Sequence, residues 1–113
     1  REAEHAYQAA LAQYKQTILH AFGQVADALT ALRHDADDVA AQQRAVDTAG
    51  AALRLARLSY EAGNAGLLQI QDAQRQLSRA SLGLIRAQSR RYMDTAQLFV
   101  ALGGSPLTGA PKP

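Results

Sequence analysis

Residues 58–80 read LSYEAGNAGLLQIQDAQRQLSRA and contain the clearest helix-breaking signal of the chain. Two glycines, Gly63 and Gly66, interrupt segments rich in Leu, Ala, Gln and Arg, which are good helix formers. Because glycine readily enters the left-handed conformation that ends a helix, the pair predicts a tight reversal over residues 62–66. The segments on either side are then expected to form two antiparallel helices.

An apolar repeat of seven residues precedes the turn. Its members are Leu11, Ile18, Val25, Leu32, Val39, Val46, Leu53 and Tyr60. The companion column three residues later is mostly small, and reads Tyr14, Ala21, Ala28, Asp35, Gln42, Ala49 and Ala56. A strict seven-residue period drifts against the 3.6-residue turn, so this helix is expected to supercoil left-handedly around partner helices. The pattern predicts one helix over about residues 3–61, roughly 90 Å long at 1.5 Å per residue.

The segment Arg33–Asp38, RHDADD, is a polar interruption of this pattern. It lacks Gly and Pro, so it predicts a polar patch on a continuous helix. Its three acids, Asp35, Asp37 and Asp38, lack the glycine and the ligand spacing of a calcium loop. They are therefore interpreted as a solvated helix face.

A second helix is predicted over about residues 67–102, roughly 54 Å long. One apolar column consists of Ile70, Leu77, Leu84 and Leu98, with Arg91 interrupting it before Leu98. A second column beside it consists of Ala73, Ala80 and Ala87. Gly103 and Gly104 end this helix, and residues 106–113, PLTGAPKP, are expected to be a flexible tail. The sequence therefore predicts an all-α fold, an antiparallel coiled-coil hairpin over residues 1–105.

The unequal lengths of the two helices predict partners outside this hairpin. About 35 Å of the first helix has no counterpart within the chain. Phe22 and Leu29 also add a second apolar stripe near its beginning. We therefore expect a segment of a longer protein, which self-associates when isolated because its seams are exposed.

The composition narrows the classes of function. Hydrophobic residues make up 48% of the chain, but 25 residues are alanine and there is no Trp, so a globular core would be thin. The absence of Cys excludes disulfides and thiolate metal sites. A net charge of +2 is too small to indicate nucleic-acid binding, and no apolar run is long enough for a membrane span.

Charge is distributed unevenly along the chain. Residues 1–62 carry eight acids and six bases, whereas residues 63–113 carry two acids and six bases, an asymmetry that suits an acidic neighbour. Seven arginines are expected on outer helix faces, where solvation and salt bridges account for most of them: Arg54, Arg57, Arg75, Arg79, Arg86, Arg90 and Arg91.

No motif for catalysis, cofactor binding or metal binding is present. The histidines His5, His20 and His34 lie 14 or more residues apart and form no i, i+4 pair. No nucleophile or acid lies in a catalytic pattern, and no glycine-rich loop follows a strand. Neither an enzyme nor a cofactor is expected.

The turn region resembles the periplasmic tip of TolC-type outer-membrane efflux proteins, nearest the OprM/NodT-like lipoprotein branch. The shared pattern is Y-x-x-G, a short gap, and then L-L-x-x-x-D-A-Q-R-x-L, which covers Tyr60–Leu77. Two weaker matches follow the same order, AFGQVADALTAL at residues 21–32 and FVALGG at residues 99–104. Together the matches span almost the whole chain.

This resemblance implies a trimeric export duct with a β-barrel in the outer membrane and a long helical barrel across the periplasm. The chain would be the last helical hairpin of each protomer, reaching to a gated tip where a periplasmic adaptor protein docks. An inner-membrane transporter would supply the substrate indirectly. Tyr60, Gly63, Asn64 and Gly66 would lie at this tip, which serves as gate and docking place.

The resemblance also gives Asp72 a role. Repeated by three-fold symmetry, this acid would form a negative ring at the constriction and concentrate cations. Some members carry a basic residue just after the turn glycine and a second acid before D-A, where this chain has Ala65 and Gln69. The alternatives are a structural coiled-coil or helical-bundle scaffold without a transport role, and an amphipathic protein that binds a membrane surface.

Overall fold

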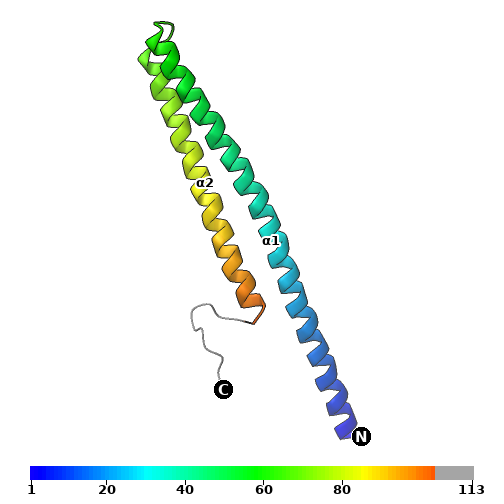
Figure 1. Ribbon diagram of the computed structural model, residues 1–113. Coiled ribbons are helices and arrows are strands. Elements are labelled where there is room, and N and C mark those ends of the chain that lie inside the picture. The colour runs from blue at the N-terminus through cyan, green and yellow to red at the C-terminus, as the bar shows by residue number, and fades with distance from the viewer. Residues whose placement is uncertain (104–113) are drawn as a thin grey trace. The chain divides into compact units, whose positions relative to one another are not determined.

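The computed structural model describes residues 1–103 and contains two helices, α1 (Glu2–Glu61) and α2 (Leu67–Ala101) (Figure 1). These bounds confirm both predicted helices and the intervening turn, and the described residues include no strand. The polar segment 33–38 is helical throughout, as expected from its lack of Gly and Pro. The tail predicted for residues 106–113 lies outside the described residues.

The chain divides into two compact units, and the boundary crosses both helices. One unit comprises residues 33–92 and the other combines residues 1–32 with residues 93–113. The first of these contains the hairpin turn. There, the later part of α1 and most of α2 run antiparallel, side by side (Figure 1).

Two cross-helix contacts define the alignment of α1 and α2 in the turn-containing unit. The Arg90 guanidinium lies 3.5 Å from the Asp38 carboxylate. Gly83 faces Gln42 so closely that a Cβ at position 83 would come within 2.6 Å of its Oε1. Glycine at position 83 therefore leaves room for the end of the Gln42 side chain, which would have to move aside for a larger residue.

Where α2 covers α1, the seven-residue columns lie in the seam between the two helices. In the first column Leu53 is buried, while Leu11 and Tyr60 at its two ends are exposed. The members between Leu11 and Leu53 are half-buried: Ile18, Val25, Leu32, Val39 and Val46. On α2 the small residues Ala73 and Ala87 are buried, with Ala87 only 1% exposed. Small side chains at these positions let the two helices approach each other closely.

One prediction about the acidic segment is wrong. Asp35 is only 8% exposed, so it does not belong to a solvated face, whereas Asp37 is exposed and Asp38 is half-buried. Asp35 lies seven residues after Ala28 in the column of mostly small residues. Because that column faces the seam, Asp35 is buried there despite its charge. Asp35 has an interaction partner, as expected for a buried carboxylate.

In the other unit, which contains residues 1–32 of α1, α2 covers only the last turns of that stretch. Residues 94–101 lie against residues 24–31, and Ala28 is buried there. All residues from Arg1 to Thr17 are exposed. The beginning of α1 therefore has no packing partner among the described residues, as the unequal helix lengths predicted.

The core is as thin as the composition indicated. Its buried hydrophobic members in the described chain are Leu53 and three alanines, Ala28, Ala73 and Ala87. Many large apolar side chains are exposed instead, including Tyr7 and Phe22 on α1. Such surfaces usually mark protein–protein contacts.

Candidate functional site: the hairpin turn

Two backbone hydrogen bonds end α1 and identify a Schellman motif. The Gly63 N–H donates to the Tyr60 carbonyl at 3.0 Å, and the Asn64 N–H donates to the Ser59 carbonyl at 2.8 Å. Gly63 has a φ of 80°, in the left-handed region that favours glycine. The predicted role of Gly63 as the helix-ending residue is confirmed.

Gly66 lies at the other side of the turn and precedes α2. Its carbonyl accepts a hydrogen bond of 3.2 Å from the Gln69 N–H in the first turn of that helix. Asn64 and Gly66 are exposed, and Leu68 just beyond them is 72% exposed. The turn therefore exposes the backbone at Gly66 and the apolar side chain of Leu68.

Tyr60 lies at the end of the seam and is 47% exposed. Its carbonyl takes part in the helix cap, but its hydroxyl has no hydrogen-bond partner among residues 1–103. With about half of its surface exposed, Tyr60 is accessible to a group from another segment.

Asp72 lies in the second turn of α2, and two neighbours on the same helix contact it. The Arg75 guanidinium lies 3.7 Å from one carboxylate oxygen, and both side chains are more than 60% exposed. The Gln76 amide donates a hydrogen bond of 3.3 Å to the other oxygen. Asp72 was predicted as a site residue without Arg75 as its partner. The i, i+3 spacing of the two residues already indicated that they could pair.

A shallow groove of about 490 Å³ runs beside Asp72 in this unit. Its α1 side consists of Ala52 and Ala56. Its α2 side consists of Leu68, Gln69, Asp72, Ala73, Arg75 and Gln76. The small alanine side chains leave an indentation beside the exposed Asp72 and Arg75. Of the predicted site residues, only Asp72 lines this groove. The others, Tyr60, Gly63, Asn64 and Gly66, lie at the turn and do not contact the groove.

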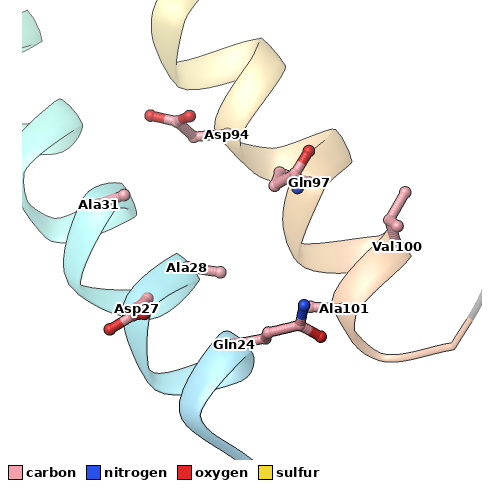
Figure 2. A pocket seen from close by; sticks show the side chains of 8 residues that line it. All are labelled: Gln24, Asp27, Ala28, Ala31, Asp94, Gln97, Val100 and Ala101. Atoms are coloured by element: carbon pink, nitrogen blue, oxygen red, sulfur yellow. The ribbon is translucent and has the colours of Figure 1, made fainter. Parts of the chain in front are cut away.

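A second groove, of about 330 Å³, lies in the unit that combines residues 1–32 with residues 93–113. Its lining is shown in Figure 2: Gln24, Asp27, Ala28, Ala31, Asp94, Gln97, Val100 and Ala101. The Gln24 side chain extends toward Ala101 in this view. Two carboxylates, two amides and small residues line an open surface that has no nucleophile.

Neither groove has the features of a reaction centre. Within residues 1–103 no group of three or more His, Cys, Asp or Glu residues could hold a metal ion. In the same part of the chain, neither helix has a segment apolar enough to cross a membrane. The features that remain are a capped turn, exposed apolar faces and unpaired helix surface. They define a class of protein, the all-α helical hairpins.

The chain belongs to the outer membrane efflux protein family. The family model of that description matches residues 1–104. The chain is 39% identical to nodulation protein T of Rhizobium leguminosarum bv. viciae, over 92% of this chain and 21% of that protein. It is 34% identical to the cation efflux system protein CusC of Escherichia coli K12, over 90% of this chain and 22% of that protein.

A third relative is the outer membrane protein OprJ of Pseudomonas aeruginosa, which is 35% identical over 90% of this chain and 21% of that protein. The chain thus spans about a fifth of the length of these relatives. No solved structure shows a significant match. The membership inferred from the turn motif is confirmed.

Proposed function

We propose that the chain is the last helical hairpin of a trimeric outer-membrane efflux channel and forms part of its periplasmic duct. In this proposal its role is passive conduction. The observation that supports this role best is the unpartnered surface: α1 is exposed from Arg1 to Thr17, where its two apolar columns begin with Leu11 and Tyr14. Such a helix requires neighbours, and a closed barrel of helices would supply them.

The hairpin turn is the proposed periplasmic tip, where the channel opens and a periplasmic adaptor docks. Tyr60, Gly63, Asn64 and Gly66 are its residues. The partly exposed Tyr60 and the exposed residues around Gly63 are available to another segment, which supports docking at this end. An inner-membrane transporter would deliver the substrate through the adaptor.

Asp72 is the proposed acid of a constriction ring. In a trimer, three such carboxylates would favour cations over anions. Arg75 at 3.7 Å places a positive charge beside each one, so the ring would be weaker than one of isolated carboxylates. Gln69 at the position of a second acid weakens it further.

Single-channel recording on the complete channel tests this function. Asp72→Asn removes the charge with little change in shape, and we expect the ratio of cation to anion permeability to fall. Asp94→Asn removes the same charge 22 residues further along α2, in the other groove, and is expected to leave the ratio unchanged.

An unchanged ratio in Asp72→Asn would remove the ring from the proposal. A complete protein that inserts in the outer membrane but conducts no ions with or without an adaptor would favour the scaffold alternative. Binding of the chain to anionic vesicles would instead support the amphipathic membrane-surface alternative.

A further inference from the structure

α2 carries a second seam that no described residue covers. Its positions alternate in steps of four and three residues: Ser78, Leu82, Ile85, Ser89 and Tyr92. All five are exposed, and Leu82, Ile85 and Tyr92 are 51%, 59% and 81% exposed. At 100° per residue this seam lies about 140° around α2 from the seam that packs on α1. It has the spacing of a second coiled-coil contact.

Arginines follow one flank of this second seam. Arg75, Arg79, Arg86 and Arg90 share one side of the helix, within about 60° of one another. Arg79 and Arg86 each come directly after a seam position and lie seven residues apart. In a coiled coil such flanking positions form the salt bridges that select the partner helix.

The two outer arginines of this flank are neutralised within the chain, and the two inner ones are not. Arg75 pairs with Asp72, and Arg90 pairs with Asp38. Arg79 and Arg86 form no ion pair with any described residue, and both are exposed.

Arginines outnumber acids in the part of the hairpin that contains the inner pair, and the nearby Asp38 is already paired with Arg90. The segment 44–92 contains eight arginines and three acids. Of these acids, Asp72 is already paired with Arg75, and Asp47 accepts a hydrogen bond from Gln43 at 3.1 Å. Glu61 is the last residue of α1, beside the turn. The positive charge at Arg79 and Arg86 therefore remains available.

We propose that the second seam of α2 binds an acidic amphipathic helix of a partner. The partner helix fills the apolar positions Leu82, Ile85 and Tyr92, and it presents Glu or Asp residues at seven-residue spacing to Arg79 and Arg86. Charge complementarity selects this occupant, because acidic side chains beside the seam would pair with both exposed guanidinium groups, whereas a basic helix would be repelled by them. The inference rests on the proposed function only in taking the hairpin to work within a larger assembly.

Peptide binding to the 113-residue chain tests the inference. The probe is a fluorescent synthetic helix of three heptads with a Leu/Ala seam and a Glu beside the seam in every heptad, and its twin carries Gln at those positions. Fluorescence anisotropy at low salt is expected to show the Glu peptide binding about three- to tenfold more tightly than the Gln peptide.

Variants assign this preference to the arginine flank. The double variant Arg79→Gln/Arg86→Gln is expected to bind both peptides equally. The matched control Arg54→Gln/Arg57→Gln removes two exposed, unpaired arginines from α1 and is expected to keep the preference. Leu82→Ser/Ile85→Ser is expected to weaken binding of both peptides. Circular dichroism of each variant verifies that it stays helical.

Several results would overturn the inference. Equal affinity of the wild-type chain for the two peptides would contradict the preference for acidic partners. Binding of neither peptide would contradict the second seam as a binding surface. Loss of the preference in the α1 control would reduce the effect to net charge.

Homodimers that are broken by Leu82→Ser/Ile85→Ser and exclude the peptide would make a second copy the occupant. Binding to phosphatidylglycerol vesicles that requires Arg79 and Arg86, without a preference between the peptides, would make a lipid surface the ligand. The peptide results do not bear on the Asp72 recordings, so a failure of the charge rule leaves the proposed duct standing. Binding to vesicles is the one result that would count against both proposals.

Discussion

At the scale of single residues, Gly63 has a conformation that other residues adopt at a cost. Its φ of 80° lies in the left-handed region, and it closes the Schellman motif at the end of α1. Gly66 does not have a positive φ, although a Cβ would meet no atom within 4 Å at either glycine. The two glycines of the turn therefore differ in backbone strain and not in space.

We predict that Gly63→Ala lowers the free energy of unfolding by about 1–2 kcal/mol, because an alanine Cβ is strained in the left-handed conformation. Gly66→Ala is the matched control and is expected to change it by less than about 0.5 kcal/mol. Urea unfolding followed by circular dichroism measures both. Equal effects of the two substitutions would mean that strain at position 63 does not determine the turn.

At the scale of the helices, packing in the seam depends on a few contacts between α1 and α2. Leu53 is the one large apolar side chain that is buried among residues 1–103, at 7% exposure, and the other buried apolar residues are alanines. Leu55, two residues away on α1, is 65% exposed. The same type of residue thus lies in the seam at one position and outside it at the other.

Truncation of Leu53 is therefore expected to have a large effect. Leu53→Ala should destabilise the chain by about 2–3 kcal/mol through lost burial and a residual cavity. Leu55→Ala, which deletes the same atoms from an exposed position, should cost less than about 0.5 kcal/mol. Thermal unfolding of the two variants provides the measurement. Similar destabilisation by both would show that Leu55 is buried in solution, for example by self-association.

At the scale of the whole molecule, stability is expected to vary along α1. Residues 1–17 are all exposed, whereas residues 45–58 lie beside α2 and include the buried Leu53. A helix without tertiary packing is marginal in water, so local opening should be easiest at the beginning of α1.

Hydrogen exchange with mass spectrometry tests this gradient. We expect amides of residues 1–17 to exchange at least about tenfold faster than those of residues 45–58 in a dilute solution of the chain. A sample in which partner helices cover α1 should lose this difference. Uniform protection in dilute solution would contradict the absence of a packing partner for the beginning of α1.

The sequence by itself determined the two helices, the turn between them and the family. These features depend on local signals: the period of the apolar residues, the glycines of the turn, and a motif contained within residues 60–77. Short-range backbone preferences and residue spacing are sufficient to specify the helices and the turn, and the resemblance of the motif indicated the family.

Only the tertiary structure decided which side chains meet across the seam. The burial of Asp35, the Asp38–Arg90 pair and the close approach of Gly83 to Gln42 depend on the alignment of α1 against α2. The tight turn limits how far the two helices can slide, but a repeat of similar apolar residues does not show which individual side chains come within contact distance. The same alignment distinguishes Arg90, which reaches a carboxylate of α1, from Arg79 and Arg86, which face outward without one. Composition could not reveal that difference, since it arises from contacts between segments distant in the chain.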